Sequence, residues 1–375
     1  MPSTRTVRVH RFSCSAPDDL SAMAAAVERG ELDPSCIVAV LGKTEGNGCV
    51  NDFTRGFASH VLKQGIVAWT GRSEREVCRT VAMVMSGGTE GGLSPHLLVF
   101  EVREQAVGAS GGSAAQPALA IGVAMTREFL PEEIGRKAQI LDTAAAVTAA
   151  MRQAGIESSA DVHYVQVKCP LLTRQRIESA FARQATVATE DTYLSMGFSR
   201  GASALGVAIA LGELDAAAID DATVCNRLDL YSGRASTSAG IELMETQIMV
   251  LGNSPAWQGD CVIGHGVMRD SIDVDAVAQA LDRVGIRAGF RLSDADRSRI
   301  AAVLAKAEPS SNGLIRGRRH VMLDDSDIHA SRHARALVGG VLAGVFGDTQ
   351  LFVSGGAEHQ GPDGGGPVAV IARRA

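Results

Sequence analysis

The sequence has few aromatic residues, no excess of basic charge and no long hydrophobic run. Phe, Trp and Tyr make up 4% of the 375 residues although 46% are hydrophobic, so we expect Ala, Val and Gly to fill most of a large core. The formal net charge of −6 provides no basic field for nucleic acid. No apolar run is long enough to span a bilayer, and the N-terminal stretch does not read as a signal peptide. We therefore expect a cytoplasmic protein that binds neither nucleic acid nor membranes.

Motifs of common metal and nucleotide sites are also missing. The seven cysteines are odd in number and lack CxxC spacing, as expected for reduced thiols. His329 and His333 are spaced as i and i+4, but the further ligands of a zinc site are absent. Gly42-Lys43-Thr44 resembles the end of a phosphate-binding loop, yet Ile37 stands where that motif requires glycine. We expect no nucleotide site there.

A motif of Ser, a small residue, Gly, any residue and Glu occurs three times in the chain. The copies begin at Ser86, Ser238 and Ser354, and apolar segments lead into the first and the last. A strand that ends in Ser-Gly presents a hydroxyl and backbone N–H groups, and glycine lets a ligand approach that backbone closely. The recurrence predicts a triplicated unit whose active parts meet in one place.

The same order of elements surrounds each motif. An apolar strand leads to a lysine, a helix with an arginine follows, and a second strand leads to the serine. The lysines are Lys43, Lys168 and Lys306, and the arginines are Arg55, Arg200 and either Arg332 or Arg335. Arg332 aligns by Ser-Arg-His-Ala with the segment 199–202, whereas Arg335 aligns better by the apolar run that follows it. We favour Arg335.

Breaks in composition divide the chain into three units. The Gly/Ser/Ala-rich stretch 105–116 has no apolar period and is the clearest linker, and a second break falls at Gly252-Asn253-Ser254-Pro255. The helix ends at 146–156 and 276–286 share Ala, Val, Ala, Gly and Ile at equal offsets, which supports internal duplication. We expect unit A at 1–104, unit B at 117–252 and unit C at 260–375. Linkers at 105–116 and 253–259 would separate them.

These residue types predict nucleophilic chemistry on a ligand with several carbonyl groups. A serine hydroxyl needs a base, and lysine serves as one only where burial or neighbouring cations lower its pKa. Arginine suits carbonyl oxygens, and backbone N–H groups after each serine can hold a developing oxyanion. Three copies match a planar ring with three similar carbonyl edges. The alternative for each lysine taken singly is a solvated amine on a buried stem.

The glycine-rich run 356–367 permits two interpretations. Composition alone favours a flexible loop. The same segment also suits a cage of backbone carbonyls for a hard cation, with Gln360 and a carboxylate as further ligands.

Four segments together resemble the cyanuric acid hydrolase/barbiturase family, and the likeness covers essentially the whole chain. They are 42–52, 86–91, 165–172 and 354–362. The resemblance implies an α/β fold of three internal repeats that form a pseudo-threefold central β-barrel with outer helices. It also implies a homotetramer and the absence of an organic cofactor.

The resemblance implies an enzyme that opens a cyclic amide by hydrolysis. The first substrate to expect is cyanuric acid, opened to carboxybiuret and then to biuret and CO2 in s-triazine degradation. Barbituric acid is the alternative substrate, and a non-enzymatic three-repeat ligand-binding scaffold is the alternative of another class. In the family the second repeat performs the chemistry, which here implies Lys168 as base and Ser238 as nucleophile.

The resemblance also implies a substrate-binding set and a structural divalent cation. The substrate-binding residues would be Arg55, Ser86, Gly87, Arg200, Ser238, Ala239, Arg335, Ser354 and Gly355, together with Lys43 and Lys306. The cation, Mg²⁺ or Ca²⁺, would be held by Glu308 and by oxygens of Ala357, Gln360, Gly361, Pro362 and Gly365. This implication reverses the preference for a flexible loop. Ala239 replaces the glycine of the other two copies, so we expect a different backbone approach in the second unit.

Overall fold

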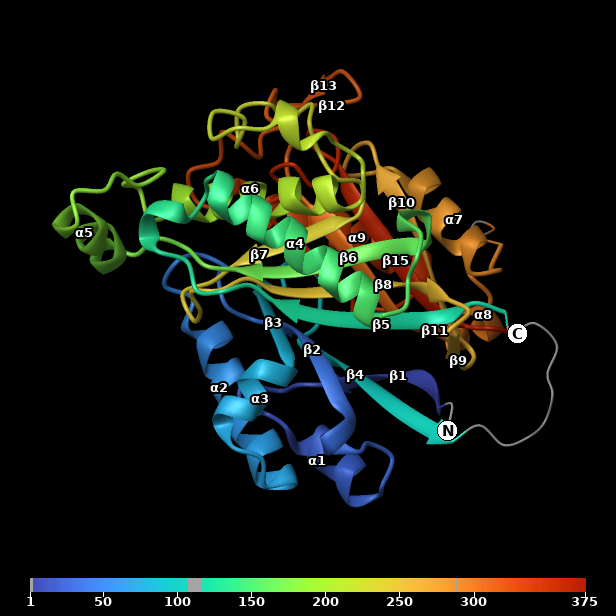
Figure 1. Cartoon of the computed structure of the whole chain (residues 1–375). Helices are drawn as coiled ribbons and strands as arrows, with labels where there is room; N and C mark the ends of the chain where they lie inside the picture. The colour runs from blue at the N-terminus through green and yellow to red at the C-terminus, as the bar shows by residue number, and fades with distance from the viewer. Residues whose placement is uncertain (1–2, 107–115, 288, 290) are drawn as a thin grey trace.

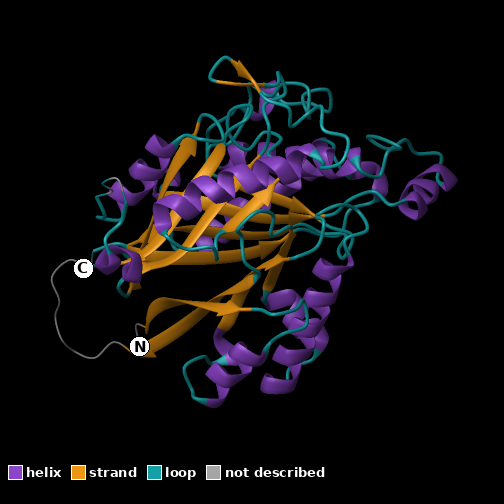
Figure 2. Ribbon diagram, turned by 180° about the vertical axis from the view of Figure 1, so that it is seen from behind, coloured by secondary structure: helices purple, strands orange, loops and turns teal. Residues whose placement is uncertain are grey.

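The computed structural model describes residues 3–106, 116–287, 289 and 291–375 and has a mixed α/β architecture. Strands form the interior, and most helices lie on the outside (Figures 1 and 2). The expected linker 105–116 falls mainly on residues that lie outside the described part of the chain. The expected second linker, 253–259, contains the end of one strand and a short strand at Trp257–Gln258.

Three large sheets in the described part of the chain share one strand order. The first is β3 (Ala82–Gly87), β2 (Ile37–Thr44), β4 (His96–Ala106) and β1 (Ser3–Ser13), extended by β9 (Trp257–Gln258). The second is β7 (Ala235–Ala239), β6 (Val162–Cys169), β8 (Gln247–Ser254) and β5 (Ala118–Met125). The third is β14 (Phe352–Gly355), β11 (Ile300–Ala307), β15 (Gly366–Arg373) and β10 (Cys261–Met268). A small ribbon pairs β12 (Leu314–Ile315) with β13 (Arg318–Arg319).

Each large sheet sets a lysine opposite a serine on the adjacent parallel strand. The register pairs are Lys43 with Ser86, Lys168 with Ser238, and Lys306 with Ser354. The lysine strand also pairs antiparallel with a third strand, which buries it between two neighbours. The local order of strand, lysine, helix, strand and serine therefore becomes one repeated arrangement in space.

The expected closed β-barrel is wrong, because the sheets are open and separate. The serine strands β3, β7 and β14 are sheet edges, and a closed barrel would need each of them to form a backbone ladder with an edge strand of another sheet. Instead, lysine amines donate hydrogen bonds to main-chain oxygens of these strands. Lys43 Nζ, for example, donates to Val353 O on β14 at 2.7 Å. Side-chain hydrogen bonds thus join the sheets at the centre of the molecule.

Helices cover the outer faces of the sheets (Figure 1). Around the first sheet they are α1 (Ser21–Glu28), α2 (Phe53–Thr70) and α3 (Glu74–Thr80). The second unit has α4 (Lys137–Gln153), α5 (Arg174–Ala182) and α6 (Leu194–Ala210), and the third has α7 (Val274–Arg283), α8 (Asp294–Arg299) and α9 (Ala330–Phe346). Single 3₁₀ turns are η1 (Pro34–Cys36), η2 (Pro131–Glu133), η3 (Ser159–Asp161) and η4 (Ala216–Ala218).

Helices α2, α6 and α9 carry the expected arginines. Asp52 caps α2 by accepting a hydrogen bond from Thr54 N, and Gly71 ends this helix with a φ of 70°. His329 caps α9, and Gly347 ends it with a φ of 64°. The caps fix where each helix begins, so Arg55 in the first turn of α2 and Arg335 in the second turn of α9 project from defined positions beside the serine strands.

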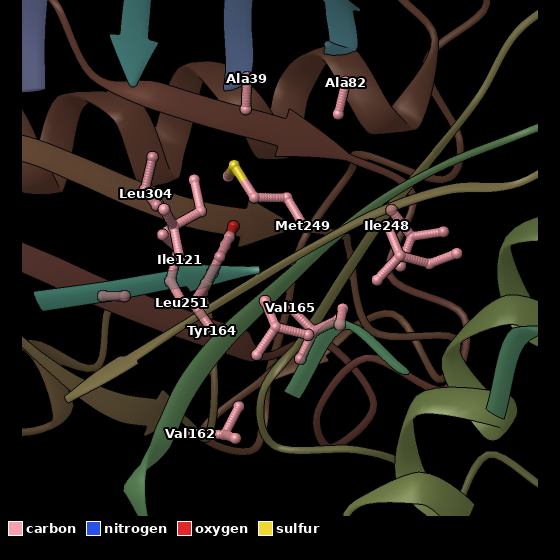
Figure 3. Close-up of a cluster of buried hydrophobic side chains, with 14 of the residues drawn as sticks. Ala39, Ala82, Ile121, Val162, Tyr164, Val165, Ile248, Met249, Leu251 and Leu304 are labelled. Carbon is pink, nitrogen blue, oxygen red and sulfur yellow. The ribbon is translucent and has the colours of Figure 1, made fainter. Parts of the chain in front are cut away.

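The largest core lies where the three sheets face one another (Figure 3). Ala39 and Ala82 come from the first sheet, Tyr164 and Met249 from the second, and Leu304 from the third. The small alanines let the strands approach closely, as the low aromatic content predicts. All seven cysteines are free thiols. In the described part of the chain, every helix is too short or too polar to cross a bilayer.

Candidate active site

A pocket lies where the three serine strands end. Its lining includes nine of the eleven residues expected to contact the substrate, together with Gly48 and Met196, which sequence reasoning missed; the expected Lys43 and Lys306 are not part of the lining. The nine are Arg55, Ser86, Gly87, Arg200, Ser238, Ala239, Arg335, Ser354 and Gly355. Residues more than 250 positions apart in the chain thus meet in one place, since Arg55 and Ser354 line the same pocket. Each of the three sheets contributes a serine and the small residue after it.

The three lysines lie buried beside the serine strands and link the sheets in a cycle. Each amine donates to the main-chain oxygen of the residue that precedes a serine on another sheet. The bonds are Lys43 to Val353 at 2.7 Å, Lys168 to Met85 at 2.8 Å, and Lys306 to Thr237 at 2.8 Å. The lysines are at most 2% exposed. Burial of this kind favours the neutral amine.

The lysine pKa values are lowered, as a lysine base requires. Burial, with Arg335 nearby, holds the pKa of Lys43 well below its usual value. Burial and Arg200 lower the pKa of Lys306 to about 7. Burial also lowers the pKa of Lys168, although the carboxylate of Glu242 opposes that shift.

The lysine–serine hydrogen bonds differ between the three sheets. Lys43 Nζ lies 3.4 Å from Ser86 Oγ, and Lys306 Nζ lies 3.2 Å from Ser354 Oγ. Lys168 instead bonds to Met85 O and forms an ion pair with Glu242, while Ser238 Oγ lies 3.0 Å from Ser354 Oγ. Among the described residues, therefore, the expected base and nucleophile are register neighbours without a hydrogen bond between them.

Two of the pocket arginines are fixed by bidentate pairs with glutamates. Arg335 binds Glu90 at 2.6 and 2.7 Å, and Arg200 binds Glu358 at 2.6 and 2.8 Å. Two parallel N–H···O bonds hold the plane of each guanidinium. Arg332 also contacts Glu90, at 3.2 Å, but its side chain is 43% exposed and it is not part of the pocket lining.

The third pocket arginine, Arg55, has different partners. It donates to Ala239 O at 2.7 Å and to Cys49 O at 2.5 Å, and its Nε lies 3.7 Å from Asp52 Oδ2. Sequence reasoning missed Asp52 as a partner of this arginine. Each of the two main-chain oxygens orients one end of the guanidinium.

Sequence reasoning also missed the three glutamates, although each ends a copy of the Ser-small-Gly-any-Glu motif. They are Glu90, Glu242 and Glu358. The fixed fifth position of the motif was the available signal. Their partners depend on the path of the chain in space, which the motif does not define.

Glycine is required after two of the three serines. A Cβ at Gly87 would collide with the Asp52 carboxylate, and a Cβ at Gly355 would collide with the Arg335 guanidinium. Ala239 carries a methyl group at the third position and is 1% exposed. The sequence predicts a different backbone approach in the second unit, where the main-chain oxygen of Ala239 accepts a hydrogen bond from Arg55.

The residues expected to hold a cation are only partly gathered. Glu308, Ala357 and Gly361 line a cavity of about 240 Å³, whereas Gln360, Pro362 and Gly365 do not. Gln360 Oε1 accepts a hydrogen bond from Thr237 N at 2.7 Å. In the described ranges, no cluster of three or more His, Cys, Asp and Glu side chains has the geometry of a metal site. The glycine-rich segment is largely buried.

Comparisons with known proteins give one consistent family. A family model described as amidohydrolase ring-opening protein matches residues 8–373. The chain is 57% identical to a cyanuric acid amidohydrolase of Ectopseudomonas oleovorans (strain CECT 5344), with 98% of this chain and 99% of the relative covered. It is 56% identical to a cyanuric acid amidohydrolase of Bradyrhizobium sp. (strain ORS 375), with 100% of each covered.

Solved structures agree with the sequence comparisons. A cyanuric acid hydrolase described in terms of structural concatenation superposes with a TM-score of 0.93 at 50% identity, covering 99% of this chain and 100% of the other. The cyanuric acid hydrolase from A. caulinodans superposes with a TM-score of 0.90 at 54% identity, covering 99% of both chains.

Proposed function

The chain belongs to the family of ring-opening amidohydrolases, and from that premise we propose that it opens the ring of cyanuric acid by hydrolysis. The observation that carries the proposal is the pocket in which three serines and three arginines converge from equivalent positions of three sheets. Cyanuric acid presents three equal carbonyl edges, so each serine–arginine set has one edge to bind. The product is carboxybiuret, which then loses CO2 to give biuret.

We assign the nucleophile to Ser238 and the base to Lys168. The neutral amine of Lys168 takes the proton of Ser238 Oγ as this oxygen bonds to a ring carbonyl carbon. The carbonyl oxygen becomes an oxyanion, which backbone N–H groups at the strand ends stabilise. The ring C–N bond then breaks, and the Lys168 ammonium gives its proton to the departing nitrogen.

A water molecule completes the reaction. It gives a proton to Lys168 and attacks the ester carbon, and Ser238 Oγ leaves with that proton. The open chain then ends in a carboxyl group on nitrogen, which is carboxybiuret. Lys168 lies opposite Ser238 across two parallel strands, and catalytic hydrogen bonds often tighten only when the substrate is bound.

The three sheets with their helices are proposed to be internal copies related by a pseudo-threefold axis. Their common strand order and the matched lysine–serine registers support this proposal. The units would span 1–104, 117–252 and 260–375. A homotetramer stays a prediction, which sedimentation equilibrium tests.

A divalent cation, Mg²⁺ or Ca²⁺, is proposed for the cavity beside Glu308. Glu308 is half-buried there, and burial together with Glu358 raises its pKa. A carboxylate in that situation fits a cation, and Ala357 and Gly361 line the same cavity. When bound, the cation supplies positive charge that keeps Glu308 ionised and holds the C-terminal loop in place.

The test is to follow cyanuric acid and barbituric acid by ultraviolet absorbance in the presence of the purified protein. We expect cyanuric acid to disappear and barbituric acid to persist. Loss of barbituric acid alone would replace the proposed substrate. Loss of neither, with binding of one, would favour a ligand-binding scaffold over an enzyme.

A further inference from the structure

The glutamates that end the three motif copies do not have equivalent partners. Glu90 and Glu358 each bind an arginine of a neighbouring unit in a bidentate pair. By the same pattern Glu242 would bind Arg55. Its Oε1 instead lies 2.7 Å from Nζ of Lys168. The threefold pattern is therefore broken at one glutamate, in the unit of the proposed nucleophile.

The backbone of the second motif copy accounts for the change of partner. Gly88 and Gly356 have φ values of 103° and 77°, in the left-handed region that favours glycine, whereas Gly240 does not adopt a left-handed φ. The loop after Ser238 therefore follows another path. A Cβ at Gly240 would collide with the carboxylate of Glu242, which folds back over this residue.

Asp52 contacts Arg55, the arginine that Glu242 would bind if the threefold pattern were complete. Asp52 Oδ2 lies 3.7 Å from Arg55 Nε, and the guanidinium also donates to Ala239 O and Cys49 O. Arg55 thus keeps its place in the pocket without a bidentate glutamate. Glu242 is free to serve the lysine instead.

Other ionisable groups lie near the Lys168–Glu242 pair. Arg55 faces both groups, Cys169 lies beside Lys168, and Arg176 on α5 lies near Glu242. Both carboxylate oxygens of Glu242 are buried, and among the described residues they have no hydrogen-bond partner apart from the ion pair with Lys168. A carboxylate in such a place is costly unless its charge is paired.

We propose that Glu242 is a positioning residue for the reaction, which directs the amine of Lys168 and stabilises the ammonium that forms when Lys168 takes the proton of Ser238. The inference rests on the proposed function. Glu242 gains and loses no proton itself. It acts on Lys168 as the carboxylate of a serine-hydrolase triad acts on its histidine. The lysines of the other two units, Lys43 and Lys306, have no such carboxylate in hydrogen-bonding distance among the described residues.

The test compares Glu242→Gln with Glu90→Gln in kcat and KM across pH. Removal of the Glu242 charge lowers the pKa of Lys168, so the rising limb of kcat/KM moves to lower pH while kcat falls at least about tenfold. Glu90→Gln frees Arg335 and should chiefly raise KM without moving the limb. Substrate ionisation is common to both variants and cancels in the comparison. Glu242→Asp, which restores the charge, should return the limb toward its wild-type position.

A second measurement needs no turnover. In protein labelled with ¹⁵N-lysine, with the signal assigned by Lys168→Met, the pKa of Lys168 Nζ should be lower in Glu242→Gln than in the wild type. If the wild type opens neither ring, the proposed function fails while this titration still tests the pairing. The proposal would be overturned if Glu242→Gln kept the wild-type kcat and the wild-type position of the kcat/KM limb. It would also be overturned if Glu90→Gln shifted that limb equally, or if the titration of Lys168 Nζ were unchanged in Glu242→Gln. Should Glu242→Gln fold poorly, Gly240→Ala displaces the same carboxylate and must give the same shift.

Discussion

Lys168 Nζ donates a hydrogen bond to the main-chain oxygen of Met85 at 2.8 Å, although the two residues lie on different sheets. Met85 immediately precedes Ser86, so a lysine of the second sheet fixes the serine strand of the first. Lys43 and Lys306 make the same kind of bond to the remaining strands. Each serine strand is thus held by a lysine of another sheet, so a change at one lysine also affects the serine of another unit.

The three serines should respond differently to removal of the hydroxyl. If Ser238 is the nucleophile, Ser238→Ala should lower kcat by about 10³-fold or more without a change in Tm. Ser86→Ala and Ser354→Ala should raise KM more than they lower kcat, because these hydroxyls would bind ring carbonyls. Steady-state kinetics of the three variants would show the difference. Equal losses of kcat at all three positions would argue against a unique nucleophile.

The two candidate arginines of the third unit offer a matched pair. Arg335 is buried in the pocket, whereas the Arg332 side chain is 43% exposed outside it. Arg335→Lys loses the planar fork and should raise KM at least about tenfold. Arg332→Lys should stay within about twofold of the wild type, since exposed ion pairs contribute little. A larger effect at Arg332 would reassign the ligand.

Removal of the proposed cation should lower stability before it affects chemistry. A ligand that binds only the folded state stabilises it, so a chelator should reduce Tm of the wild type by several degrees. Glu308→Gln should lower Tm by a similar amount, and the chelator should not lower the Tm of this variant further. Glu308 has a raised pKa, so protons compete with the cation and the chelator effect should shrink as the pH falls. An unchanged Tm in the wild type would remove the cation from the account.

A histidine pair between β6 and β10 should make stability depend on pH. His163 Nδ1 lies 2.8 Å from His265 Nδ1. Burial and Arg283 lower the pKa of His163 to about 4, and burial, His163 and Arg283 lower that of His265 to about 3. The unfolded chain binds more protons than the folded one below about pH 6.5, so stability is complete above that pH and is lost as the pH falls toward about 3 to 4.

The pair can be tested by urea unfolding between pH 4 and 8. The double variant His163→Asn/His265→Asn should show a flatter loss of stability on acidification than the wild type. His60→Asn, at an exposed position, serves as the control and should keep the wild-type slope. Equal slopes in all three proteins would show that the pair does not contribute.

The strands and the pocket residues were within reach of the sequence because their signals are local. Apolar runs mark β2, β3 and β11, and glycine after serine marks the ends of two serine strands. Two eight-residue strands escaped notice, as did the two-residue strands β9, β12 and β13. β8 ends within Gly252-Asn253-Ser254, which reads as a break, and β15 begins with the last Gly-Pro of the glycine-rich run. Antiparallel pairing with buried neighbours overrides these local preferences.

The connections at the centre were beyond sequence reasoning for a different reason. The same pattern of strands in the sequence is compatible with a closed barrel and with three open sheets. Which of the two forms depends on whether backbone hydrogen bonds or lysine side chains join the edges of the sheets. The partner of Glu242 was also beyond sequence reasoning. Its motif is the same as those of Glu90 and Glu358, but the backbone of its loop follows a different path. Only the path of the backbone at Gly240 distinguishes its partner.

The central claim is that Lys168 is the base, and kcat/KM against pH for Lys168→Met, Lys43→Met and Lys306→Met tests it most directly. The wild type should gain activity through an apparent pKa clearly below the value of about 10.4 for free lysine. That value belongs to the Lys168–Glu242 pair, whose two groups interact. Lys43→Met and Lys306→Met remove amines that hold the serine strands of other units, so they should weaken binding and leave the limb near its wild-type position. Lys168→Met should nearly abolish turnover at every pH, and substantial residual activity in this variant with the wild-type profile would contradict the account.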